Sequence, residues 1–123
     1  MLTGANPIAF VATTDVERAR DFYEGALGLT LVEQTPFALV FEARGTELRV
    51  TPVERLEPAT HTVLGWSVAS ASGTARKLIE SGIELELYEG LEQDELGIWD
   101  APSGARVAWF RDPDGNVLSI SQV

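Results

Sequence analysis

One order of secondary-structure signals occurs twice in this chain, and no other feature restricts the fold as strongly. An apolar run at 7–12 precedes a helical pattern and then strand patterns that end near Val50. A second apolar run at 62–68 begins the same order again and leads to Val123. One such unit leaves a face of its sheet uncovered, so two copies are expected to associate. The sequence predicts an α+β fold of two tandem βαβββ modules, whose curved mixed sheet encloses a cleft suited to a small molecule.

Both helices have start and stop signals. Thr14 with Glu17 three residues later forms a capping-box pattern, and Gly28 marks the end of the first helix. Ser70 or Ser72 caps the second helix, and Gly82 ends it. The first helix is expected to bury a stripe of apolar residues: Val16, Ala19, Phe22, Tyr23, Ala26 and Leu27.

Strand signals fill the rest of each module. The first module has them at 29–35, 36–43 and 46–52, with a turn at Gly45. In the second module, Ile83–Tyr88 alternates apolar and polar residues and predicts a half-buried strand. An acidic loop at 89–104 is expected next, then strands at 105–111 and 116–122 around the turn 112–115.

These signals predict a single domain over 1–123. Module one covers about 5–52, a linker rich in proline and glutamate covers 53–60, and module two covers about 61–123. The second module is longer because of the extra residues at 89–104, and inserted loops are a common place for function.

Charge and cysteine content exclude several functions. The net charge of −10 disfavours nucleic acid and anionic membrane surfaces as partners. The chain has no cysteine, so it has no disulfide, thiolate metal site or cysteine nucleophile. With no signal peptide and no apolar run of membrane-spanning length, a cytoplasmic location is expected.

Two strings carry a family resemblance. The segment 14–29 reads TDVERARDFYEGALGL, and the segment 110–116 reads FRDPDGN. Together with the duplicated order, they resemble the vicinal oxygen chelate superfamily, which includes glyoxalase I, extradiol dioxygenases, fosfomycin-resistance enzymes and bleomycin-resistance proteins. The resemblance covers essentially the whole chain and implies a fold rather than a reaction, because both strings are structural.

The resemblance also locates where enzymes of this superfamily hold a divalent metal with histidines and carboxylates. The matching positions here are Ile8, Arg49, Val63 and Ser119. None of the first three is a normal metal ligand, and serine is a poor one. We therefore expect no metal and no other cofactor.

Strand alternation predicts which residues face the cleft. Arg49 and Thr51 lie opposite Leu48 and Val50, and Ser119 lies opposite Leu118. The bulky faces are assigned to the helices, which leaves a polar, roomy face for the cleft. The candidate ligand-binding residues are Phe10, Arg49, Thr51, Val63, Gly65, Trp99, Trp109 and Ser119.

Several of these candidates have two interpretations. Arg49 either clamps a carboxylate, phosphate or carbonyl group or pairs with Glu47 or Asp100. Trp99 either folds over the cleft as part of a lid or packs on the core edge or a second subunit. For Phe10 and Trp109, a place on the cleft face and plain core packing both remain open.

Three functions follow as hypotheses. The first is a metal-free binding protein for a small organic ligand, similar to the antibiotic-sequestering bleomycin-resistance proteins, which are dimers; a homodimer is therefore expected. The second is a metal-dependent glyoxalase-like lyase, isomerase or dioxygenase that recruits His61, the only histidine, and acids such as Glu47. The third is an assembly domain without catalysis, in which side chains fill the cleft.

Overall fold

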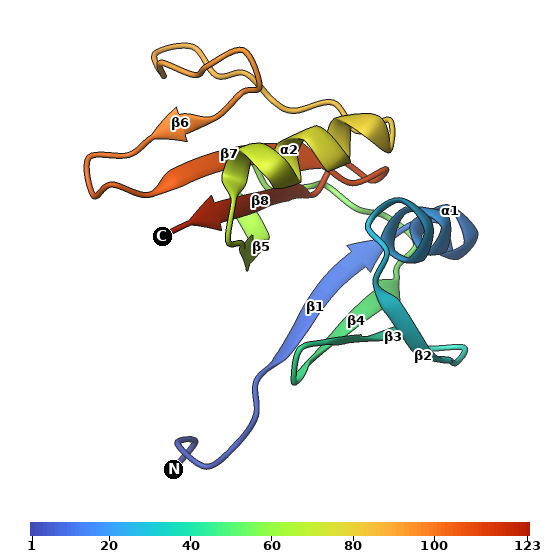
Figure 1. Cartoon of the computed structure of the whole chain (residues 1–123). Coiled ribbons are helices and arrows are strands. Elements are labelled where there is room, and N and C mark those ends of the chain that lie inside the picture. The colour runs from blue at the N-terminus through green and yellow to red at the C-terminus, as the bar shows by residue number, and fades with distance from the viewer. The chain divides into compact units, whose positions relative to one another are not determined.

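The computed structural model describes all residues, 1–123, and divides into two compact units, Met1–Glu57 and Pro58–Val123 (Figure 1). The boundary between them falls within the 53–60 segment. Each unit contains one module and has its own sheet. The assignment of a single domain and the cleft between the modules stay predictions.

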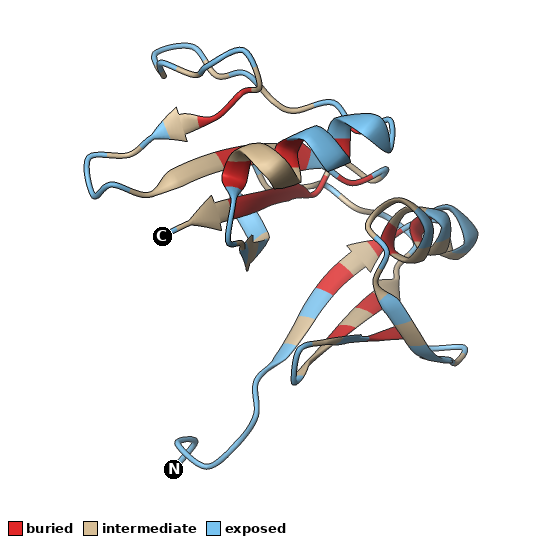
Figure 2. Ribbon diagram, in the orientation of Figure 1, coloured by how far each residue is buried: buried red, intermediate tan, exposed pale blue.

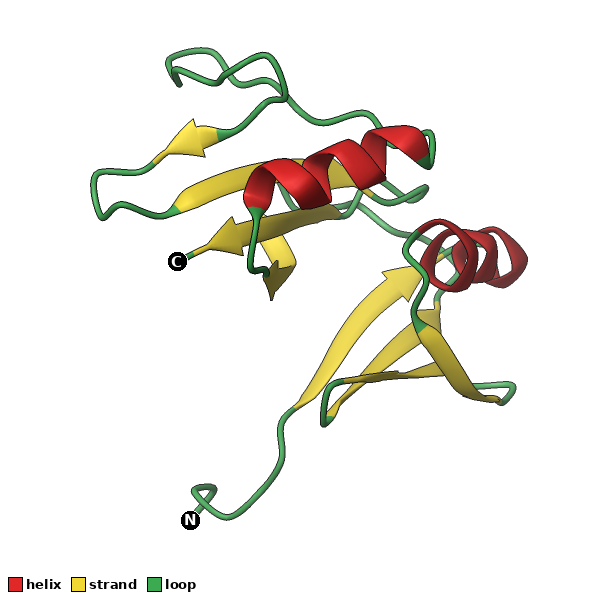
Figure 3. Cartoon of the chain, in the orientation of Figure 1, coloured by secondary structure: helices red, strands yellow, loops and turns green.

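The first module has the predicted order of elements. They are β1 (Ile8–Thr13), α1 (Val16–Arg20), the π-helix η1 (Asp21–Ala26), β2 (Thr30–Gln34), β3 (Leu39–Ala43) and β4 (Thr46–Pro52) (Figure 3). The strands form a sheet in the order β1-β4-β3-β2, in which β1 is parallel to β4 and the other pairs are antiparallel.

One face of this sheet carries the core. Leu48 and Val50 of β4 are buried, whereas Arg49 and Thr51 between and beyond them are only partly covered, which confirms the predicted alternation. Tyr23 of the helix is fully buried, and its ring lies 6.0 Å from that of Phe41. The helix is therefore held on the sheet by an aromatic contact.

The start of the first helix differs from the prediction. Asp15, not Thr14, is the N-cap, because its carboxylate accepts a hydrogen bond of 3.1 Å from the Arg18 amide. The helix then widens to π geometry over Asp21–Ala26. Of the predicted apolar stripe, only Ala19 and Tyr23 are buried.

The second module repeats the order with different lengths. Its elements are β5 (Thr62–Ser67), α2 (Ala71–Glu80), β6 (Trp99–Asp100), β7 (Arg106–Arg111) and β8 (Val117–Gln122). Its sheet has the order β5-β8-β7-β6, with β5 parallel to β8. The two four-stranded mixed sheets with their helices confirm the α+β fold of two βαβββ modules.

The core of the second module lies under α2. Ser70 caps this helix through a 3.0 Å bond from the Gly73 amide, as one of the two predicted residues. The helix buries Ala71, Ala75 and Leu78, and the buried stretches of α2 and β8 stand out in Figure 2. Phe110 is also buried and stacks on Trp66 with ring centroids 6.4 Å apart. Trp66 thus belongs to the helix-covered face, as predicted.

Two predictions for the 83–104 segment were wrong. The expected strand Ile83–Tyr88 makes only one isolated bridge, between Leu85 and Phe110. Instead, the Gln93 side chain accepts a hydrogen bond from the Tyr88 amide and donates one to the Glu86 carbonyl. These backbone groups are therefore not free to continue a strand ladder. The expected 89–104 loop contains a short strand, β6, which pairs with β7 at Trp99↔Val107.

The turn at 112–115 is fixed by its aspartate. The Asp112 carboxylate is buried and accepts hydrogen bonds from the amides of Asp114 and Asn116. This aspartate organises the turn, as the sequence predicted from the Asp-Pro-Asp-Gly string. It is thereby occupied in structure rather than available for acid–base chemistry.

Candidate functional site

The open face of the second sheet, opposite α2, carries a row of aligned residues. Gly65, Ser119 and Trp109 are register partners across β5, β8 and β7. A Cβ atom on Gly65 would lie 2.6 Å from the Ser119 hydroxyl oxygen, so any larger residue at 65 requires the serine hydroxyl to move. Ser119 is buried in the central strand.

Trp109 spans this face. Its indole Nε1 donates a 3.1 Å hydrogen bond to the hydroxyl of Thr62. Because β8 lies between β5 and β7, the indole that makes this bond extends across β8. A tryptophan held at its polar end is a rigid surface, since its rotamer is fixed before any ligand arrives.

Two more rings contact Trp109. The ring of Tyr88 meets it edge to face at 5.4 Å and 80°, and the ring of Trp99 lies at 6.0 Å and 33°. We call Tyr88, Trp99 and Trp109 the aromatic cluster. All three residues are half-buried, so the cluster is neither closed core nor free surface.

Charged groups border the aromatic cluster. Glu86 forms an ion pair with Arg111. Burial raises the pKa of the Tyr88 phenol, the negative charge of Glu86 raises this pKa further, and Arg111 lowers it. The phenol is therefore neutral at physiological pH and available as a hydrogen-bond donor or acceptor.

The open face of the first sheet carries a different group. Arg49 Nε donates to the Glu47 carboxylate at 2.6 Å, one of the two ion pairs that the sequence suggested. The other predicted partner, Asp100, pairs with Arg106 instead. Phe10 is the register partner of Arg49 on β1 and is 62% exposed.

The guanidinium of Arg49 keeps its two terminal nitrogens unused. Only Nε takes part in the bond to Glu47, and the Nη atoms make no hydrogen bond within the first unit. Arg49 is 43% exposed in its side chain. The arrangement orients a two-pronged donor of the kind that binds carboxylate or carbonyl oxygen.

The predicted site residues thus fall into two groups. Gly65, Trp99, Trp109 and Ser119 come together on the second sheet, and Phe10 and Arg49 lie side by side on the first. Thr51 is two residues beyond Arg49 on the same strand. Val63 lies where the β5–β8 register shifts, and it is exposed.

Sequence reasoning missed Tyr88 and Thr62. Both reach Trp109 through contacts that join residues distant in the sequence, at separations of 21 and 47. Alternation within 83–88 did separate Tyr88 from Leu85 and Leu87, but it gave no sign of which ring Tyr88 would meet.

The residues at the metal positions that the resemblance implies do not fit a metal. The side chains of Ile8 and Val63 have no ligand atom, Arg49 is a cation engaged with Glu47, and Ser119 offers one neutral hydroxyl. His61 is exposed at the start of β5. Neither unit contains a group of three histidine, aspartate or glutamate side chains able to hold a metal ion.

Comparison with known proteins identifies the family. The model of the glyoxalase/bleomycin resistance protein/dioxygenase superfamily matches residues 4–120. The chain belongs to this superfamily. Among curated proteins, none matches the sequence.

Solved structures share the superfamily fold. A glyoxalase family protein from Bacillus anthracis superposes with a TM-score of 0.77 at 18% identity, over 96% of this chain and 93% of the other. Lactoylglutathione lyase from Agrobacterium tumefaciens gives 0.76 at 17% identity, over 99% and 96%. The antibiotic-binding protein TnmS3 from Streptomyces sp. CB03234 gives 0.73 at 24% identity, over 99% and 98%. At these identities the likeness concerns the fold alone.

Neither helix of the superfamily member is long and apolar enough to cross a membrane.

Proposed function

We propose that this superfamily member binds a small organic molecule that contains an aromatic ring, and that it does so without a metal or other cofactor. The observation that carries the proposal is the aromatic cluster on the open face of the second sheet. Two half-buried rings beside the fixed indole of Trp109 offer a stacking surface, and the nearby serine and threonine hydroxyls offer hydrogen bonds.

The rigidity of the cluster supports binding. The Trp109 rotamer is set by its bond to Thr62, and Trp99 is held in the edge strand β6. A ligand therefore loses little affinity to the ordering of these side chains.

The first module carries a polar group of its own. We propose that the terminal nitrogens of Arg49 bind a ligand oxygen there, flanked by Phe10 and Thr51 on the same sheet face. Glu47 compensates the charge of Arg49, so this group favours a carbonyl or a delocalised carboxylate over a dianionic phosphate. The remaining proposed contacts are those of Val63, Gly65 and Ser119.

One observation supports a binding protein rather than a metal-dependent enzyme. The positions that the resemblance assigns to metal ligands carry Ile8, Arg49, Val63 and Ser119, whose side chains do not fit a metal. Both an antibiotic-binding protein and a lyase have this fold, so the fold alone does not separate the two functions. We further propose a homodimer, which light scattering coupled to gel filtration tests.

A ligand screen followed by calorimetry tests the proposal. Anionic metabolites and glycopeptide antibiotics are screened by tryptophan fluorescence, and the affinity of each hit is measured. Trp99→Ala removes one ring at the sheet edge and is expected to weaken binding about five- to tenfold. Trp66→Phe, on the helix-covered face against Phe110, is the matched control and leaves the affinity unchanged.

Metal analysis separates this proposal from a metal-dependent enzyme. Protein purified without chelators is expected to carry no stoichiometric nickel, zinc, iron or manganese. One equivalent of any of these in the native fold would contradict the proposal and favour a lyase, isomerase or dioxygenase. Ligands whose affinity is unchanged by both Trp99→Ala and Arg49→Ala would also contradict the proposal.

A further inference from the structure

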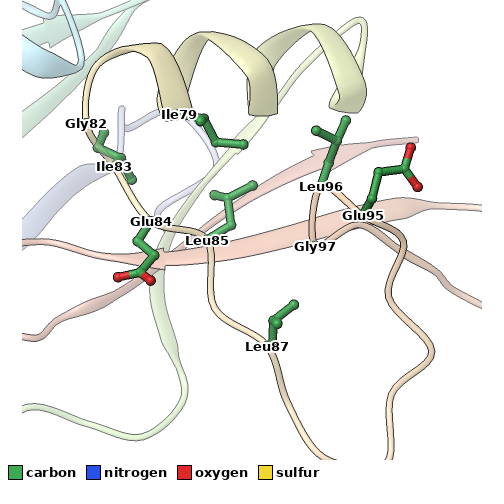
Figure 4. Close-up of a pocket in the computed structure, with 9 residues that line it drawn as sticks. All are labelled: Ile79, Gly82, Ile83, Glu84, Leu85, Leu87, Glu95, Leu96 and Gly97. Atoms are coloured by element: carbon green, nitrogen blue, oxygen red, sulfur yellow. The ribbon is translucent and has the colours of Figure 1, made fainter.

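A pocket lies on the α2 side of the second module. It has a volume of about 480 Å³ and opens between the end of α2 and the 83–97 segment (Figure 4). Its floor and walls are apolar, from Ile79, Leu85, Leu87 and Leu96, and its rim carries Glu84 and Glu95. This volume is within the range of small-molecule sites.

The pocket is separate from the aromatic cluster. Leu85 pairs with Phe110, whose ring is on the helix-covered face, whereas Glu86 and Tyr88 turn toward the opposite face. Alternate residues of 83–88 thus face the pocket and the aromatic cluster, even though no strand forms there.

Apolar side chains are displayed in this pocket rather than buried. Ile79 is 45% exposed and falls outside the buried stripe of α2, and Leu87 is 73% exposed. In Figure 4, Ile79, Leu85 and Leu96 converge on one space. Grouped exposed apolar side chains of this kind are typical of binding surfaces.

Hydrogen bonds hold the pocket in shape. Gln93 Nε2 donates to the carbonyls of Glu86 and Gly97 at 2.9 and 2.8 Å, and its Oε1 accepts from the Tyr88 amide at 2.7 Å. The Asp94 carboxylate accepts from the amides of Leu96 and Ile98, each at 2.9 Å. The backbone that carries Leu87 and Leu96 is therefore held without a ligand, which lowers the entropic cost of binding.

The turn that carries Leu96 packs tightly on the opposite wall. Gly97 has a φ of +92°, and a Cβ atom there would lie 3.3 Å from Leu85. Glycine thus allows the two segments to approach closely, and the apolar walls form one surface.

The rim is negative and unpaired. Glu84 and Glu95 form no ion pair, and Figure 4 shows their carboxylates directed away from the apolar floor. The chain as a whole carries a net charge of −10. A cationic head group is attracted to this rim, and an anionic one is repelled.

We propose that this pocket is a second ligand site, which binds the hydrocarbon part of a small amphiphilic cation while Glu84 and Glu95 attract its head group. The apolar walls provide the affinity, and the carboxylates at the rim make the pocket prefer a cationic head group to an anionic one. This site does not depend on the function proposed for the aromatic cluster.

Three probes of equal chain length test it: octylammonium, octanol and octanoate. Methyl NMR is expected to show shifts at Ile79, Leu85 and Leu96, with affinities in the order octylammonium, octanol, octanoate. The affinities of octylammonium and octanoate should differ about tenfold, which is the size of effect that two exposed charge interactions allow. Octanoate binding as tightly as octylammonium, or shifts that arise at the aromatic cluster instead, would overturn the site.

Variants separate the walls from the rim. Leu96→Asp, checked for folding by its amide spectrum, is expected to abolish binding of all three probes. The double variant Glu84→Gln/Glu95→Gln should keep octanol binding and remove the preference for octylammonium. Its control is Glu80→Gln/Glu92→Gln, which changes the net charge equally outside the pocket. An equal effect of both double variants would overturn the role of the rim.

Methyl shifts that change with protein concentration in the absence of any probe would show that a second copy covers the pocket. This result would overturn the assignment to a small cation.

Discussion

The two modules share one order of elements but differ in what their open sheet faces carry. In the first module, the face presents an ion pair, Arg49–Glu47, beside the exposed ring of Phe10. In the second, Trp109 crosses the central strand and gathers Tyr88 and Trp99. The helix-covered faces are alike, since both bury one large aromatic, Phe41 or Phe110, at the sheet. Duplication therefore conserves the side that folding needs and leaves the other side free to acquire different chemistry.

The connection that follows the helix also differs between the modules. In the first module, only residues 27–29 separate η1 from β2. In the second module, residues 81–98 separate α2 from β6, and Gln93 braces this segment. The longer connection brings Tyr88 and Trp99 to Trp109, so the inserted residues account for most of the difference between the faces.

The largest expected effect tests the likeness of the two cores. Phe41→Ala and Phe110→Ala each leave a cavity at a fully buried ring and should lower the free energy of unfolding by about 3–5 kcal/mol. Chemical denaturation measures both. Losses that differ by more than about 2 kcal/mol would mean that the modules do not rely on their cores equally.

Loss of the Gln93 amide tests the braced segment. Gln93→Ala removes three hydrogen bonds and leaves partly buried backbone groups without partners, so a loss of about 2 kcal/mol is expected. Hydrogen exchange at the Tyr88 amide should accelerate. Gln34→Ala, which removes one exposed bond to Arg20, is the control and should change little. Unchanged exchange at Tyr88 would show that other contacts hold the segment.

The close approach of Gly65 and Ser119 gives a third test. Gly65→Ala places a Cβ atom 2.6 Å from the serine hydroxyl and should cost about 1–3 kcal/mol. Ser119→Ala removes the clashing oxygen and leaves the nearest atom, the Ser119 carbonyl oxygen, at 3.4 Å. The double variant should therefore recover most of the loss in thermal denaturation. Additive losses would instead place the strain in the backbone.

The smallest effect is expected at the ion pair of the first module. Glu47→Gln should reduce stability by less than about 1 kcal/mol, because both side chains are exposed by roughly two fifths and water screens the pair. Added salt should shrink the difference between the variant and the original chain. A larger loss that salt leaves unchanged would mean that this face is more enclosed than the first module alone suggests.

Much of the fold was readable from local patterns. Strands β4, β7 and β8 fall where alternation and turn residues predicted them, and Ser70 caps α2 as one of two proposed residues. The errors occurred where a side chain competes with the backbone. Asp15 displaces Thr14 as the cap, and Gln93 prevents the 83–88 strand, because a carboxylate or amide can take bonds that a regular element would make.

The candidate site was only partly readable. Alternation correctly separated Arg49 from Leu48 by burial, and Ser119, which pairs with Trp109, from Leu118, which pairs with Phe110. It did not reveal that Arg49 is held by Glu47 through Nε alone, nor that Tyr88 and Thr62 meet Trp109. Such contacts depend on register and on rotamers, which no local pattern encodes.

The sequence by itself determined the duplicated order of elements, the buried face of β4 and the superfamily resemblance. These are local properties, set by residue spacing and by side-chain preference for water or core. Only the tertiary structure decided that the 83–97 segment is braced rather than extended, that three rings gather at Trp109, and that a pocket opens beside α2. Each of these requires residues distant in the chain to meet, and pairing across strands sets which ones do.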